Sequence, residues 1–182
     1  MKNLIVCFLI IILFTSCSKN KPEDLKKIAE EELKNGNIQG AIEKYEELVN
    51  NYPYSSNSPE NLFMLGQLLQ AQEGDSVQKL SNYKKAIEYY SQILSNYPNY
   101  SKTPEATFMI AFIYSEIFKD YKLAEQYYKR FLKLYPSHEL AQSVQAELDN
   151  LGKTAEEILN EKINSDKETS TPKIASKKNK SK

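Results

Sequence analysis

The sequence predicts an all-α fold, a right-handed solenoid of three helical hairpins closed by a C-terminal capping helix. The main observation is one segment that occurs three times, at Ala41–Pro53, Ala86–Pro98 and Ala124–Pro136. Its offsets of 45 and 38 residues fall among the periods of helical repeat arrays. Each copy has alanine first, tyrosine four residues later and Tyr-Pro at its end. Unrelated amphipathic helices would not share these positions, and repeats of this kind build a binding surface.

Residues 1–16 are predicted to be a secretory signal. Lys2 precedes the apolar run Leu4–Phe14, which is too short to span a bilayer, since a spanning helix needs roughly 20 residues, but suits a signal sequence. Leu13–Cys17 resembles the lipobox of bacterial lipoproteins, although Phe14 occupies a position where leucine is usual. We therefore expect lipidation of Cys17, residues 17–22 as a tether, and a place in the outer membrane facing the periplasm. An ordinary signal peptide or an uncleaved anchor are the alternatives.

A helical domain is predicted over residues 23–160. Its first helix has a proline in the first turn, at Pro22, and stops at Asn35-Gly36-Asn37. The first repeated segment follows as the antiparallel partner. Ser58-Pro59-Glu60 and Thr103-Pro104-Glu105 are predicted to cap and start the next two hairpins, and the proline of each Tyr-Pro pair stops the second helix.

The repeated residues predict how the hairpins pack. The repeated tyrosines share the face of the repeated alanines, and bulky residues extend that face: Tyr45, Tyr90, Tyr128, Leu48, Ile93 and Phe131. The preceding helices carry small residues at Ala29, Gly66 and Ala111. We expect these to lie against the repeated alanines where two helices cross closely.

Four further segments complete the chain. The insertion Ala71–Asn82 is predicted to be a loop, because it contains Gly74-Asp75-Ser76. Ser137–Leu151 should form the capping helix, and a capping box at Thr154–Glu157 should start a short helix ending near Glu161. Residues 161–182 are predicted to be a disordered, lysine-rich tail. That tail either solubilises the protein or contacts anionic lipid or peptidoglycan.

These residues resemble the tetratricopeptide repeat over about Pro22–Pro136. The resemblance rests on the small residue of the first helix and on the alanine, aromatic residue and proline of the second. Leu48, Ile93 and Phe131 replace the usual second alanine, and the connections between hairpins are long. Both features resemble the periplasmic branch that includes BamD and CpoB, as does the closing segment Tyr135–Lys153. BamD has more repeats and CpoB is not a lipoprotein, so the resemblance is to the branch.

Reaction chemistry is not predicted, so we expect no enzyme, no cofactor and no metal site. The chain has one histidine, His138, and no phosphate-binding glycine loop. Its only cysteine besides Cys17 lies in the expected signal. Lysine plus arginine and aspartate plus glutamate number 24 each, so no global field attracts nucleic acid.

The resemblance implies a concave groove lined by the first helix of each hairpin. The positions that carry over are Glu23, Lys26, Glu30 and Leu33, then Glu60, Phe63, Gln67 and Gln70, then Glu105, Phe108, Phe112 and Ser115. The phenylalanines and glutamines suit an apolar peptide whose backbone bonds to side-chain amides. The alternative is that Phe63, Phe108 and Phe112 pack into neighbouring repeats.

The favoured function is a non-catalytic periplasmic scaffold that binds a protein partner in this groove, in outer-membrane protein assembly as the resemblance to BamD implies. An alternative is a coordinator of cell envelope or division that links the outer membrane to peptidoglycan or the Tol-Pal machinery, as the resemblance to CpoB implies. A third reading is an envelope hydrolase or its regulatory subunit. The scarcity of histidine and cysteine argues against that third reading.

Overall fold

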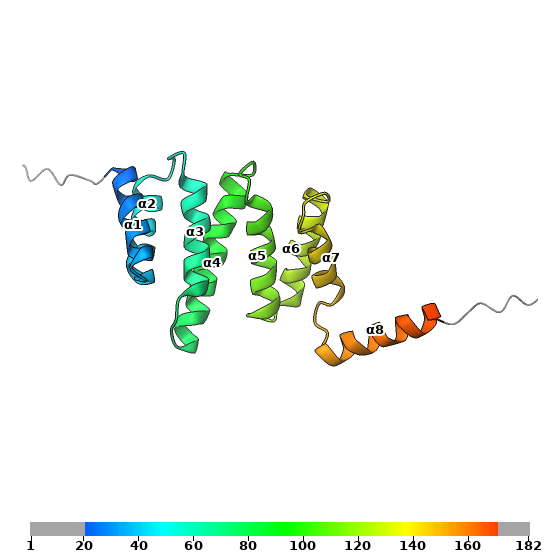
Figure 1. Ribbon diagram of the computed structural model, residues 1–182. Coiled ribbons are helices and arrows are strands. Elements are labelled where there is room, and N and C mark those ends of the chain that lie inside the picture. The colour runs from blue at the N-terminus through cyan, green and yellow to red at the C-terminus, as the bar shows by residue number, and fades with distance from the viewer. Residues whose placement is uncertain (1–20, 171–182) are drawn as a thin grey trace, which may run out of the picture.

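The computed structural model describes residues 21–170, and this part of the chain forms eight helices and no strand (Figure 1). The helices are α1 (Pro22–Lys34), α2 (Ile38–Asn51), α3 (Ser58–Ala71), α4 (Ser76–Asn96), α5 (Thr103–Glu116), α6 (Tyr121–Leu134), α7 (Ala141–Asp149) and α8 (Ala155–Ser170). The predicted all-α class is confirmed. The expected signal, Cys17 and residues 171–182 lie outside the described residues.

The helices form a solenoid of hairpins. α1 packs on α2, α3 on α4 and α5 on α6, and each second helix also packs on the first helix of the next hairpin, up to α6 on α7. Figure 1 shows α1 to α7 side by side in a row, with α8 projecting from the end. Contacts along the row run mainly through the second helices. One side of α1, α3 and α5 is therefore left for other contacts.

The repeated residues of the second helices lie in the core. Tyr45, Tyr90 and Tyr128 are at most 2% exposed, and Leu48, Ile93 and Phe131 at the following position are also buried. These residues belong to two adjoining clusters, one extending from α1 to α5 and the other joining α5, α6 and α7. The predicted packing face of the second helices is confirmed.

Ser58 and Thr103 do not cap helices as expected. Each is the first residue of its helix and is buried, and neither Asn57 nor Lys102, at the cap positions, makes a side-chain cap. The Ser58 hydroxyl donates to the Tyr52 carbonyl at 3.0 Å, and the Thr103 hydroxyl donates to the Tyr97 carbonyl at 2.9 Å. These hydroxyls tie the end of one hairpin to the start of the next. Each carbonyl also accepts a backbone N–H of the turn, from Ser55 at 3.1 Å and from Tyr100 at 3.0 Å, so the hydroxyl adds a second hydrogen bond to it.

Gly66 lies against the ring of a repeated tyrosine, and its contact with a repeated alanine stays a prediction. A Cβ atom at this position would overlap Cζ and Cε1 of the Tyr90 ring. The second hairpin therefore needs glycine because the ring of Tyr90 lies directly against the α3 backbone.

The insertion in the second hairpin is mostly helical, contrary to the loop prediction. Only residues 72–75 separate α3 from α4, and Asp75 caps α4 by accepting a hydrogen bond from the Gln78 N–H at 2.8 Å. Asn82 is 2% exposed and bonds to Gln72 and Gln78 at 2.8 Å each. The inserted residues thus lengthen α4 at its start and are fastened to the end of α3.

The C-terminal elements differ in length from the prediction. The capping helix α7 starts at Ala141, after a turn. The capping box at Thr154 is confirmed, because Thr154 N–H donates to Glu157 at 2.7 Å and Glu157 N–H donates to the Thr154 hydroxyl at 3.2 Å. α8 continues to Ser170, so the predicted disordered tail from residue 161 is wrong for residues 161–170. None of the helices within residues 21–170 is both long and apolar enough to cross a membrane.

Candidate protein-binding surface

The residues predicted to line a groove lie on α1, α3 and α5, and their accessibility varies widely. We call the side of these helices that faces away from the second helices the first-helix face. Of the six residues singled out on α3 and α5, Gln67 is exposed and Gln70, Phe108 and Phe112 are half-buried. Phe63 and Ser115 are only 6% and 4% exposed. The six residues therefore do not form one uniform surface.

Phe63 packs inside the second hairpin and contributes little to its surface. Its ring centroid lies 5.6 Å from that of Tyr90 in a tilted arrangement. The ammonium group of Lys102 lies 5.1 Å from the centre of the Phe63 ring, a cation–π contact from the next connection. For this residue the alternative of packing within the repeats holds.

Gln70 and Ser115 are also engaged within the fold. The Gln70 amide donates to the Tyr90 hydroxyl at 2.7 Å and to the Gly66 carbonyl at 3.1 Å. The Ser115 hydroxyl donates to Glu116 at 2.8 Å. With Phe63, they correct the expectation of free partner contacts at all six positions.

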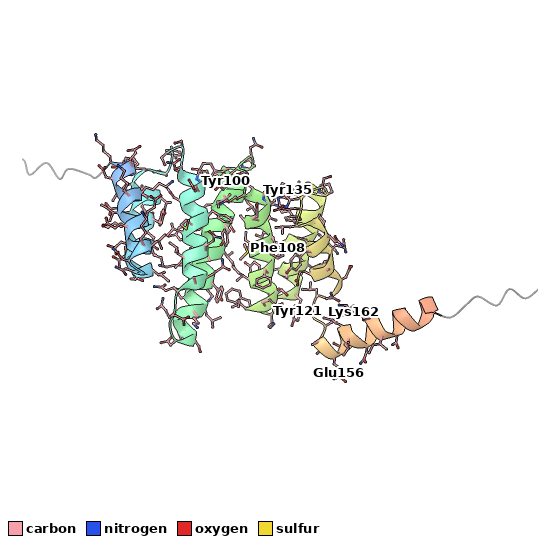
Figure 2. The ribbon with its side chains drawn as sticks, viewed as in Figure 1. Tyr100, Phe108, Tyr121, Tyr135, Glu156 and Lys162 are labelled. Atoms are coloured by element: carbon pink, nitrogen blue, oxygen red, sulfur yellow. The ribbon has the colours of Figure 1, made fainter. Side chains whose placement is uncertain are left out.

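Phe108 and Phe112 are the aromatic residues that remain accessible among the six. Their ring centroids are 5.9 Å apart, and Phe108 also lies 6.1 Å from Tyr128. Figure 2 shows Phe108 on α5, near the middle of the row of helices. Together with Gln67 on α3, these two rings are the residues among the six that remain open to a partner. Their use by a partner stays a prediction.

A cleft of about 270 Å³ opens between α1 and α3, and we call it the N-terminal cleft. It is lined by Lys26, Glu30, Leu33, Lys34, Tyr45, Glu60, Asn61 and Met64. The Lys26 ammonium meets the Glu60 carboxylate at 3.1 Å across the two helices. Tyr45 comes from α2 and forms the floor, where burial raises its pKa to about 12, with further contributions from Glu30 and Glu60. Asn61 is 2% exposed, and its buried Oδ1 atom accepts no hydrogen bond.

A second cleft, of about 390 Å³, lies where α5, α7 and the start of α8 meet, and we call it the C-terminal cleft. It is lined by Phe112, Ser115, Glu116, Lys119, Tyr121, Glu147, Asn150, Leu151, Gly152, Lys153, Ala155 and Ile158. The Ser115 hydroxyl, followed by Lys119, lowers the pKa of the Glu116 carboxyl. Phe112 is the residue that connects this cleft with the accessible rings of α5.

Between residues 21 and 170, no group of histidine, cysteine, aspartate and glutamate side chains could hold a metal ion. His138 lies in the turn before α7, where its Nδ1 atom accepts the Leu140 N–H at 3.2 Å and its ring stands edge-on to Phe131. That histidine supports the turn.

An array of helical hairpins with an accessible first-helix face defines a repeat scaffold that binds other proteins. The sequence model of the tetratricopeptide repeat matches residues 27–55, 60–100 and 105–138. These ranges cover more than half of the chain, which therefore belongs to the tetratricopeptide repeat family. A search of curated proteins finds no match to the chain. The family relation supports a protein-binding scaffold, and such proteins are typically non-catalytic.

Asn61 and Lys102 were not predicted as site residues. Asn61 follows Pro59-Glu60, at the position that Ala106 takes after Pro104-Glu105. Because Ala106 is fully buried, a polar residue at the equivalent place was a signal that could have been read from the repeats. Lys102 lies in a connection outside the repeated segments. No repeated pattern indicates that Lys102 covers Phe63.

Proposed function

We propose that this protein is a lipid-anchored scaffold of the bacterial outer membrane that faces the periplasm and holds a segment of a partner protein on its first-helix face. The observation that carries the proposal is the placement of Gln67, Phe108 and Phe112. They are accessible on the face that lies between two clefts, while the repeated tyrosines are buried. Accessible aromatic rings beside an amide suit an extended peptide with apolar side chains.

The anchor rests on the sequence Leu13–Cys17. The test follows the mature chain in a bacterial host labelled with a radioactive fatty acid. Wild-type protein should carry the label and sediment with outer membranes, while Cys17→Ala should lose the label and appear in the soluble fraction. An unlabelled wild-type chain would contradict the anchor and leave protein binding untouched.

The partner is sought by photo-crosslinking, with benzoylphenylalanine in place of Gln67 on the first-helix face. The matched control carries the same amino acid in place of Gln126, an exposed glutamine on the second helix α6. We expect a crosslinked protein at position 67 that is absent at position 126 and weakened by Phe112→Ala. Equal crosslinking at the two positions would contradict binding at the first-helix face.

The identity of the crosslinked protein separates two roles. Outer-membrane assembly proteins would support the favoured role in that process, by resemblance to BamD. Residues 171–182 contain five lysines and no acidic residue, a composition that favours contact with peptidoglycan carboxylates or anionic lipid. Recovery of Tol-Pal or peptidoglycan-linked proteins would therefore support the role as an envelope coordinator.

A further inference from the structure

The N-terminal cleft contains an unused hydrogen-bond acceptor. Asn61 lines this cleft, is 2% exposed, and its Oδ1 atom is buried without a partner. Buried polar atoms in native proteins are normally paired, and each exception calls for an explanation. A ligand that brings an N–H donor into the cleft would complete this group.

Two carboxylates act on Tyr45 at the floor of the cleft. Glu30 and Glu60 both add to the effect of burial in raising the pKa of Tyr45. The lining also includes two lysines, but Lys26 is paired with Glu60 at 3.1 Å and Lys34 is exposed at the last turn of α1. Glu30 has no ion pair among the described residues. An incoming positive charge would therefore meet a carboxylate without an ion pair and, in the cleft wall, the buried and unpaired Oδ1 of Asn61.

The dimensions of the cleft suit a single side chain. Its volume of about 270 Å³ is at or below the lower end of the roughly 300–1,000 Å³ usual for pockets that hold whole small molecules. Leu33 and Met64 supply apolar, half-buried walls. Long basic side chains lay their methylene stems along such walls and keep the charged head at a polar group.

We infer that the N-terminal cleft binds the cationic head of an arginine or lysine side chain in the partner segment, with Asn61 Oδ1 accepting an N–H and Glu30 supplying the opposite charge. The inference deepens the proposed function and rests on it, because the side chain is assigned to the partner segment. It adds a basic residue to a partner otherwise recognised through apolar contacts.

The test titrates full-length protein with capped single amino acids and follows the Asn61 side-chain amide by nuclear magnetic resonance. The probes are the N-acetyl methylamides of arginine, lysine, citrulline and glutamate. We expect saturable shifts with arginine or lysine and a dissociation constant on the order of 1–10 mM. Citrulline has nearly the shape of arginine but no charge, and should bind at least about tenfold more weakly, a difference of about 1.4 kcal/mol. Equal binding of arginine and citrulline, preference for glutamate, or no shift with any probe would overturn the inference.

Variants separate the two named groups. Asn61→Asp should strengthen binding of the cationic probes several-fold, because a charged acceptor forms a stronger hydrogen bond. Glu30→Gln should weaken binding several-fold. Its matched control, Glu31→Gln, removes the same charge from an adjacent exposed residue that does not line the cleft, and should leave binding unchanged. Equal effects of Glu30→Gln and Glu31→Gln would assign the binding to the general charge of α1 and overturn the site. The exposed Glu30 keeps this comparison available if a variant of Asn61 does not fold.

Failure of this site and failure of the proposed function give different results. If wild-type protein and Glu30→Gln capture the same partner equally well, the scaffold function stands and the cation site is wrong. If wild-type protein binds the arginine probe but captures no partner, the cleft binds cations and the proposed function is wrong.

Discussion

The first and second hairpins hold a tyrosine at the same position, but they cover it with different residues. Over Tyr90, the Phe63 ring lies at a centroid distance of 5.6 Å and the Gln70 amide donates to the hydroxyl at 2.7 Å. The equivalent positions over Tyr45 are Lys26, which turns to Glu60, and Leu33. The second hairpin is closed at this point, whereas the first has the N-terminal cleft there.

This difference shows how one scaffold can carry different sites. The repeated residues of the second helices are buried in both hairpins, so they set the packing and leave little to vary. The covering residues come from the first helices, at positions where the two hairpins carry different residues, Lys26 and Leu33 in the first and Phe63 and Gln70 in the second. Exchange of an aromatic ring for a lysine can thus open a cleft without altering the hairpin beneath it.

The largest expected change in stability comes from replacing the residues that cover the two tyrosines. Phe63→Ala should lower the free energy of unfolding by about 3 kcal/mol, because a buried ring leaves a cavity over Tyr90. Lys26→Ala should cost less than about 0.5 kcal/mol, because it removes only a partly exposed ion pair. Urea unfolding of both variants gives the comparison. Similar losses would mean that Lys26 covers Tyr45 as tightly as Phe63 covers Tyr90.

The next prediction concerns the close approach of Tyr90 to α3. Alanine is a better helix former than glycine, yet Gly66→Ala should destabilise the protein by about 1–3 kcal/mol because its Cβ overlaps the Tyr90 ring. The first hairpin has alanine at the equivalent position, and Ala29→Gly there should also destabilise, by about 1 kcal/mol through helix propensity. Both variants should therefore unfold at a lower urea concentration than the wild-type protein, although one replaces glycine by alanine and the other replaces alanine by glycine. A gain in stability for Gly66→Ala would show that the ring moves aside freely.

Much of this architecture was predictable from the sequence. The thrice-repeated alanine, tyrosine and Tyr-Pro positions correctly indicated three hairpins and their buried face, because a repeated pattern reports a repeated environment. The capping box at Thr154 was predictable for a related reason, since Thr154 and Glu157 bond to each other's backbone within one turn.

The candidate site was harder to predict because accessibility depends on neighbouring hairpins. The register placed Phe63 and Phe108 at equivalent positions, yet Phe63 is buried under Lys102 while Phe108 is half-buried. Helix lengths were also misjudged in polar segments, where periodicity is weak. The start of α4 and the end of α8 are examples.

A smaller effect should distinguish the three repeated hydroxyl groups. Tyr90→Phe should cost about 1 kcal/mol, because it removes the acceptor of the Gln70 hydrogen bond. Tyr45→Phe should cost less than about 0.5 kcal/mol, since nothing within residues 21–170 hydrogen-bonds to that hydroxyl. Tyr128→Phe should be neutral or stabilising, because its hydroxyl is buried without a hydrogen-bond partner and the Ser115 hydroxyl bonds to Glu116 instead. Equal losses in calorimetry or urea unfolding would remove the distinction between open and closed hairpins.

The smallest expected effect is a change of stability in alkaline solution, where the ionisation of Tyr45 depends on the environment of the N-terminal cleft. The folded chain raises the pKa of Tyr45 from 10.0 to about 12, so between these values the unfolded chain releases a proton that the folded chain keeps. This contribution to stability is complete below pH 10 and declines as pH rises toward 12.

Tyr45→Phe should make the decline shallower, and Glu30→Gln should lower the pKa of Tyr45 by removing a nearby negative charge. Glu31→Gln should not do so. The measurements are urea midpoints at increasing pH and the carbon resonance of the Tyr45 ring, assigned with Tyr45→Phe. Titration of Tyr45 at its ordinary pKa would mean that water reaches the floor of the cleft freely, which would remove the negative, desolvated environment that favours a basic side chain.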